Sequence, residues 1–299
     1  MVLKGTRIIR APRRVVQLLY RTPHTMERRP WKGCLYSVLT SYPMDPTMLR
    51  TVVSAALLVP ALAYGEALVE GVQTGISDET RTSLAALIAS DDRPDRHKAR
   101  DQYRRPMETL DFCSIDPTNT VVEIWPGGQG GWYRRIIEPL VTDAGGTYIP
   151  VTKDRKYLSE EAAVPYGEVD LVLVFRAHGF MIYDKPAQRY VDSLFAMLKP
   201  GGTFCIVDHA GDESIPQDPD GENGYVNESH FRAMAEEAGF VLAATSAHNR
   251  NAADDKDHPR GVYSLPPTFA GTRKGSDARA EFAAIGESDR FTHLYVKPE

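Results

Sequence analysis

Two apolar runs of this sequence end in side chains that could bind an anion or exchange protons, four in all. Arg176 and His178 follow one run, and Asp208 and His209 end the other. An imidazole titrates near neutral pH, so either histidine could serve as a general base. Asp208 could polarise His209 or hold a metal ion, and Arg176 could pair with an acidic substrate group or with Asp208. Caps and solvated strand ends are the alternative roles; the candidate catalytic residues are His178, Asp208 and His209.

A glycine-dense turn follows an earlier apolar run. Residues 121–133 read VVEIWPGGQGGWY, with Glu123 before four glycines. Glycine lets the backbone approach a ligand closely, and the helix expected after the turn offers free N–H groups. Trp125 and Tyr133 could stack on a base or contact a cation, or they could pack in the core. The cofactor-binding candidates are Glu123, Trp125, Gly127, Gly128, Gly130, Gly131 and Tyr133.

The order of acid and glycines separates two kinds of nucleotide site. The dinucleotide-binding fingerprint places its glycines directly after the strand and an acid about 20 residues later. Here Glu123 comes before the glycines. This order disfavours a nicotinamide-dependent oxidoreductase and suits a cofactor without a pyrophosphate.

Apolar runs and helical segments alternate from residue 120 onward, which indicates a mainly parallel sheet. We expect a capped helix over 77–90 before this region, followed by a charge-dense stretch at 91–105. That stretch is either a solvated helix or loop, or a lid whose arginines point at a carboxylate. The polar segment 246–288 is long for a loop and so is functional or disordered. The expected strands are 120–125, 146–151, 169–175, 204–208, 240–245 and 289–296, and the later helices are 132–140, 185–198 and 227–238.

These motifs resemble the class I S-adenosylmethionine-dependent methyltransferases. The closer similarity is to a bacterial family of methyltransferases with N-terminal signal peptides, and it rests on the EIWPGG element at 123–128. It covers roughly residues 80–299. The resemblance implies an α/β fold, a three-layer, doubly wound, mainly parallel seven-stranded sheet with a reversed last strand. Further matching elements lie at 105–112, 132–133, 170–178, 198–202, 207–209, 237–240 and 288–291.

The resemblance also implies a cofactor and a reaction. S-adenosylmethionine would lie over Gly127–Gly131 with its amino-acid end near Glu123, and its methyl group would pass to a small-molecule acceptor. One feature favours a different function. The second expected strand, 146–151, does not end in the acid that such enzymes use for ribose hydroxyls. The alternative is an exported, noncatalytic metabolite-binding protein on a methyltransferase scaffold.

Composition is that of a globular chain of 299 residues, with 42% hydrophobic and 25% charged side chains and a net charge of −5. Residues 1–47 are basic, with nine Lys/Arg and two Asp/Glu, so the remainder is clearly acidic. An acidic body argues against nonspecific binding of nucleic acid. We expect a small-molecule substrate, no nucleic acid and no stable membrane insertion; the sequence leaves the oligomeric state open.

The apolar stretch 52–63 follows Met48-Leu-Arg50 and precedes small residues suited to cleavage, which is typical of a secretory signal peptide. A buried helix is the alternative. We therefore expect an over-extended N-terminus at 1–47, a signal peptide at 48–65, a helical N-terminal arm at 66–110 and a methyltransferase-like domain at 111–299. The expected location is the periplasm.

Cysteines and acidic residues give few further signals. The chain has three cysteines, Cys34, Cys113 and Cys205, and no zinc pattern. Cys205 lies within an apolar run, so it is interpreted as a small core residue, although a Cys113–Cys205 disulfide is permitted in an oxidising compartment. The segment 251–258 holds three carboxylates and a histidine that could bind a hard cation, but a solvated loop is the favoured interpretation and no metal centre is predicted.

Overall fold

The computed structural model describes residues 74–127, 130–152, 164–177 and 187–299. The predicted over-extended N-terminus (1–47) and signal peptide (48–65), together with Gly128 and His178, lie outside these residues. No helix among the described residues is long and apolar enough to cross a membrane.

A single twisted sheet organises the described chain. Its strands are β1 Thr120–Ile124, β2 Thr147–Val151, β3 Val169–Phe175, β4 Leu198–His209, β5 Val241–Ser246 and β6 Arg290–Val296, in the order β2-β1-β3-β4-β6-β5. Strands β2, β1, β3 and β4 pair in parallel, and β6 runs antiparallel to both β4 and β5. The expected doubly wound, mainly parallel sheet with a reversed last strand is thus confirmed. The described residues form six strands where seven were expected.

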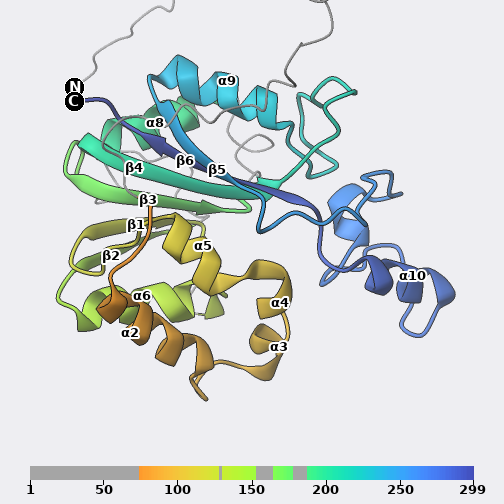
Figure 1. Ribbon diagram of the computed structural model, residues 1–299. Helices are drawn as coiled ribbons and strands as arrows, with labels where there is room; N and C mark the ends of the chain where they lie inside the picture. Colours follow the sequence, from red (N-terminus) through yellow and green to blue (C-terminus); the bar gives the residue numbers. More distant parts are fainter. Residues whose placement is uncertain (1–73, 128–129, 153–163, 178–186) are drawn as a thin grey trace, which may run out of the picture. The chain divides into compact units, whose positions relative to one another are not determined.

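Helices cover both faces of the sheet (Figure 1). Helices α2 Asp78–Ala89, α5 Pro106–Phe112 and α6 Arg134–Asp143 lie on one face, and α8 Gln188–Met197 and α9 Glu228–Ala238 lie on the other. Alternate side chains of β1 enter the two cores, because Val121 joins the cluster under α6 while Val122 joins the cluster under α8. Burial on both faces explains why β3 reads as a continuous apolar run.

Local sequence signals set several element ends. The side chain of Ser77 accepts a hydrogen bond from the Thr80 amide and caps α2. Gly239 adopts a φ of 103° and ends α9. At the start of β4 the register with β3 jumps from Leu198 opposite Val169 to Thr203 opposite Leu171. The glycine-rich turn at 199–202 is therefore a bulge inside a longer strand, and β4 begins earlier than predicted.

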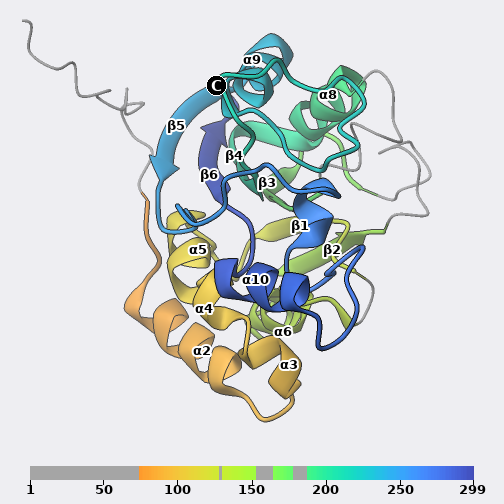
Figure 2. The same cartoon turned by 90° about the vertical axis from the view of Figure 1, so that its right-hand side faces the viewer.

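Two segments predicted as loops are folded parts of the domain. The segment 247–289 contains the short helix η3 Gly261–Ser264 and α10 Asp277–Ile285. It lies beyond the ends of β3 and β4, on the same side as α3 Asp95–Lys98 and α4 Asp101–Arg104 (Figures 1 and 2). Arg93, His97 and Arg104 are buried, so the charge-dense stretch at 91–105 is not a solvated loop.

A disulfide joins Cys113, at the end of α5, to Cys205 in the middle of β4. Their Cα atoms are 5.5 Å apart, and the two residues are separated by 92 positions in the sequence. The interpretation of Cys205 as an unpaired core residue is wrong, although its side chain is fully buried as expected. The bridge fixes one helical layer to the centre of the sheet.

Candidate functional site

The chain reverses its direction of winding between β1 and β3. From β1 it crosses to β2 on one side, and it then returns to β3 on the other side. Ligands of doubly wound sheets bind in the crevice outside the carboxyl ends of the strands at such a switch point. The glycine turn follows β1, and Arg176 follows β3, so the described sequence-predicted residues of 123–127 and Arg176 lie at this edge.

Strained backbone marks both strand ends at the switch point. Trp125 has a φ of 51° and Arg176 a φ of 58°, both in the left-handed region. Residues other than glycine seldom adopt this conformation, and it persists where the surrounding structure imposes it, commonly at ligand sites. The main chain explains how it is held, because the amide of Trp125 donates to Val151 and the amide of Arg176 donates to Val207. Both strained residues therefore lie at the carboxyl edge of the sheet.

Glu123 is a buried acid at the end of β1. Its side chain accepts a 2.6 Å hydrogen bond from the Tyr148 hydroxyl of β2, and the residue is 2% exposed. Burial raises the pKa of Glu123 to about 7, and the Tyr148 hydrogen bond and the nearby Arg134 oppose this shift only in part. At neutral pH the carboxyl group is thus divided between its neutral and ionised forms, and a nearby cation would favour ionisation.

Glycine occupies the positions of the turn for different structural reasons. Gly127 has a φ of 81°, which only glycine adopts without strain. A Cβ on Gly131 would come within 1.7 Å of the Pro126 carbonyl oxygen, so the turn itself requires this glycine. A Cβ on Gly130 would meet no atom of the described residues within 4 Å. Among these residues, the turn therefore leaves space at Gly130.

The aromatic residues beside the turn differ in their surroundings. The ring of Trp125 packs edge-on against Tyr190, and its buried indole N–H has no hydrogen-bond partner. Tyr133 is 5% exposed, its ring lies against Phe175, and its hydroxyl donates to the Arg104 carbonyl oxygen. Tyr133 is therefore a core residue. Among the described residues, Trp125 has an indole N–H without a hydrogen-bond partner at the strand end.

Asp208 and His209 lie at the end of β4, as the sequence predicts. The Asp208 carboxylate accepts a hydrogen bond from the backbone amide of His209, and Nδ1 of His209 contacts the Ser288 hydroxyl. His209 also lies opposite Arg290 in the β4–β6 register. The imidazole is therefore held by the segment leading into β6, and the carboxylate contact shown for Asp208 is to the main chain.

A buried group of arginines at this edge was missed by the sequence analysis. Arg100, Arg104 and Arg290 all contact the carboxylate of Glu287, which is 2% exposed; the Arg104 Nε distance is 3.3 Å. Arg176 forms no ion pair with Glu287, but it lies close enough to this group for the charges of Arg290, Glu287 and Arg100 to act on its pKa, so we include it as the fourth member. The signals in the sequence were the arginine-rich stretch 91–105, through its possible orientation toward a carboxylate, and Arg176, through its possible pairing with an acidic substrate group. We call Arg100, Arg104, Arg176 and Arg290 the arginine cluster.

The acidic segment at 251–258 is an internal network. Asp254 is 2% exposed, and its carboxylate accepts hydrogen bonds from the Tyr225 hydroxyl and from the Asp289 amide. His258 Nε2 lies 2.8 Å from the same carboxylate. The expected solvated loop is therefore wrong for Asp254, although Asp255 is exposed. Ligand atoms of Asp254, Asp255 and His258 lie within 4.8 Å of one another.

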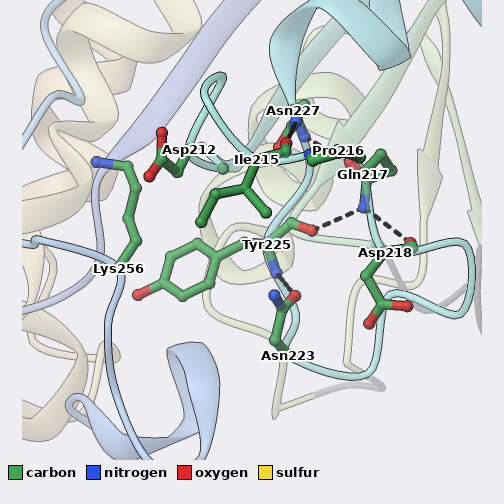
Figure 3. Close-up of a pocket in the computed structure, with 10 residues that line it drawn as sticks. Asp212, Ile215, Pro216, Gln217, Asp218, Asn223, Tyr225, Asn227 and Lys256 are labelled. Atoms are coloured by element: carbon green, nitrogen blue, oxygen red, sulfur yellow. Dashed lines mark hydrogen bonds between the residues drawn. The ribbon is translucent and has the colours of Figure 1, made fainter. Parts of the chain in front are cut away.

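A small hollow of about 120 Å³ lies beyond the end of β4 (Figure 3). Figure 3 shows Lys256 and Asp212 on one side of it, with the Tyr225 ring between them and Gln217. Gln217 donates to the carbonyl oxygens of Asp218 and Tyr225, at 3.0 and 3.3 Å. Much of the polar lining is thus paired within the protein. A second hollow, of about 160 Å³, lies beside Tyr103, Glu287 and Ser288, next to the arginine cluster.

No protein-family model matches this chain, and no curated protein matches it. Several solved structures follow a similar chain path. A SAM-dependent methyltransferase from Aquifex aeolicus is 13% identical over 73% of this chain and 98% of that chain, with a TM-score of 0.41. A geranyl diphosphate C-methyltransferase from Streptomyces coelicolor is 11% identical over 71% and 87%, with a TM-score of 0.42.

A phosphoethanolamine N-methyltransferase from Haemonchus contortus is 14% identical over 66% of this chain and 53% of that chain, with a TM-score of 0.38. At such identities and TM-scores, these similarities assign neither a ligand nor an activity to the chain.

Proposed function

We propose that this protein binds S-adenosylmethionine at the carboxyl ends of β1 and β3 and transfers its methyl group to a small-molecule acceptor. The observation that carries the proposal is the space at Gly130, in the turn that follows the strand ending in the buried acid Glu123, at the point where the winding of the sheet reverses. The low identities of the similar structures leave the acceptor open.

The described residues fit this cofactor in charge and shape. The Glu123 carboxyl can ionise beside the ammonium group of the amino-acid end, because its pKa is about 7. The unpartnered N–H of Trp125 can donate to an oxygen of the cofactor, and Gly130 leaves room for the ligand. The aromatic ring of Trp125 can also attract a cation through its face.

Bound S-adenosylmethionine supplies an electrophilic methyl group, so the protein's task is to orient the acceptor and, where needed, remove a proton. His209 can take such a proton, because its imidazole lies at the end of β4. Its contact with Ser288 fixes the ring. His178, predicted for the same task, lies outside the described residues and stays a prediction.

We also propose that the protein is exported to the periplasm. The Cys113–Cys205 disulfide supports this location, because disulfides form and persist in oxidising compartments. The predicted signal peptide points the same way. Since S-adenosylmethionine is made in the cytoplasm, an exported protein would favour the second candidate function, a noncatalytic protein that binds another metabolite in the same crevice. The absence of an acid at 147–152 is the specific observation in its favour.

Calorimetric titration with S-adenosylmethionine and S-adenosylhomocysteine tests the proposal. The parent protein should bind both, and Gly130→Leu should bind at least tenfold more weakly because the new side chain fills the open space. Ala144→Leu is the matched control: Ala144 is exposed near the start of β2, at the opposite edge, and its variant should bind normally. No heat with the parent at millimolar ligand would reject the methyltransferase and favour the binding protein.

A further inference from the structure

The arginine cluster brings three guanidinium groups, those of Arg100, Arg104 and Arg290, together around one carboxylate, with Arg176 nearby. Glu287 is the acid that pairs with them among the described residues, through contacts with Arg100, Arg104 and Arg290. Arg104 and Glu287 have side chains 2% exposed, and that of Arg290 is 3% exposed. Burying a charge costs several kcal/mol unless an opposite charge and hydrogen bonds compensate for it. A single carboxylate leaves the cluster strongly positive.

The hydrogen bonds of the cluster are also incomplete. Each arginine keeps one buried nitrogen without a partner: Nη2 of Arg100, Nη1 of Arg104, Nε of Arg176 and Nε of Arg290. Buried N–H groups without acceptors are rare and costly. Part of the charge of Arg104 is compensated by the Trp132 ring, whose centre is 4.9 Å from the guanidinium carbon. The remaining donors point to an acceptor that the described residues do not supply.

Arg176 is the member with no structural pairing. Its side chain forms no hydrogen bond or ion pair with another described residue, although it is half-buried and its Nε is fully buried. Burial and the charge of Arg290 lower the pKa of Arg176 to about 10, which still leaves it charged at neutral pH. The strained backbone that follows β3 holds this arginine at the switch point. The contacts of the described residues do not account for a half-buried cation held in this way.

The position of the cluster relates it to the proposed transfer reaction. Arg176 ends β3, the strand that pairs with β1 and therefore adjoins the glycine turn. Arg290 lies opposite His209, the described candidate base. The partly exposed Arg100 and Arg176 give the cluster a route to solvent. An acceptor held by the cluster would thus lie beside the proposed cofactor site.

We propose that the arginine cluster binds an oxyanion, a carboxylate or a phosphate, of the methyl acceptor, so that the substrate is an acidic small molecule. That the anion belongs to the methyl acceptor rests on the proposed function. Binding of the anion by the cluster does not depend on it. Guanidinium groups suit both anions because they offer parallel N–H donors to two oxygens. The structure therefore assigns an anionic substrate class to a protein whose own net charge is −5.

Binding of simple anions tests the inference without any cofactor. Inorganic phosphate and succinate are titrated into the full chain by calorimetry, with succinamide as the uncharged probe and with constant ionic strength. We expect millimolar binding of at least one anion, no binding of succinamide, and a rise in Tm with the bound anion. Binding of only one of the two anions would identify the recognised group as a phosphate or a carboxylate. Failure of both anions overturns the inference.

Variants locate the binding. Arg176→Gln should weaken anion binding at least tenfold with little effect on stability, because the parent side chain makes no structural pair. Arg176→Lys should recover part of the affinity. Arg232→Gln removes an exposed arginine paired with Glu236 and should behave like the parent. Equal affinity of Arg176→Gln and the parent would place the anion elsewhere and also overturn the inference.

Titration of the same samples with S-adenosylmethionine separates the two proposals. Arg176→Gln should retain the parent's cofactor affinity. Anion binding without cofactor binding would reject the methyltransferase and keep the anion site. Cofactor binding without anion binding would keep the methyltransferase and reject the site.

Discussion

At the scale of single residues, burial controls the ionisation of Glu123 at the proposed cofactor site. Its carboxyl lies at the end of a central strand, out of water, and the Tyr148 hydroxyl is its shown partner. Such a group resists ionisation until an opposite charge arrives. Binding of a cationic ligand near Glu123 would therefore release a proton at neutral pH, which makes this acid both a binding group and a pH-sensitive one.

The raised pKa of Glu123 has a consequence for stability. Because the folded-state value of about 7 exceeds the ordinary value of 4.5, stability is full below about pH 4.5 and is lost as pH rises toward 7. Glu123→Gln keeps an acceptor for Tyr148 and cannot ionise. We expect the variant to be more stable than the parent at pH 8, by up to about 3 kcal/mol, and to match it near pH 5. Urea denaturation at the two pH values measures this difference; an advantage that does not change with pH would contradict it.

At the scale of elements, the strands follow from local pattern. The run 169–175 could be predicted to the residue because it is buried on both faces and ends where polar residues resume. The start of β4 could not, since its bulge at 199–202 is fixed by pairing with β3. The arginine cluster and the disulfide escape prediction for a related reason. Their members are far apart in the sequence, and only the packed fold brings them together.

The segment 247–289 shows how polar residues can build a folded element. Asp254 lies at its centre and bonds the Tyr225 hydroxyl, the Asp289 amide and His258. Each bond replaces water with a protein partner for a buried charge, so a composition typical of a solvated loop forms a compact layer instead. This layer delivers Glu287 and Ser288 to the carboxyl edge, where they meet the arginine cluster and His209.

The disulfide stabilises the junction of α5 with β4. Closing a loop of 92 residues lowers the entropy of the unfolded chain, which predicts a contribution of roughly 3–5 kcal/mol. The double variant Cys113→Ser and Cys205→Ser should lose this amount in urea denaturation. Dithiothreitol should destabilise the parent by a similar amount and leave the double variant unchanged. If the reductant affected both proteins equally, the bridge would not be the cause.

At the scale of the whole domain, one acid connects distant parts of the chain. Glu287 precedes β6, and its partners Arg100 and Arg104 lie 187 and 183 positions away in the helical segment before β1. The segments α3–α4 and 247–289 are thereby fixed to each other at the carboxyl edge of the sheet. The same contacts position the nitrogens proposed to bind the substrate, so scaffold and recognition share the arginine cluster.

This sharing predicts how the domain responds when Glu287 is neutralised. Arg290, Arg104 and Arg100 depress the pKa of Glu287 to about 2, so its stabilising effect is present above its ordinary value of 4.5 and is lost as pH falls toward 2. Glu287→Gln leaves buried arginines unpaired and should cost about 3–5 kcal/mol at pH 7.

Phosphate should partly replace the lost carboxylate, because the cluster of Glu287→Gln carries one more unbalanced positive charge than that of the parent. At constant ionic strength, we therefore expect phosphate to raise the Tm of Glu287→Gln more than that of the parent. Glu236→Gln, which removes the exposed partner of Arg232, controls for the change in net charge and should respond like the parent. Thermal unfolding with and without phosphate measures all three proteins. An equal phosphate response in Glu287→Gln and the parent would mean that the arginines and their acid form a closed structural network, with no place for an external anion.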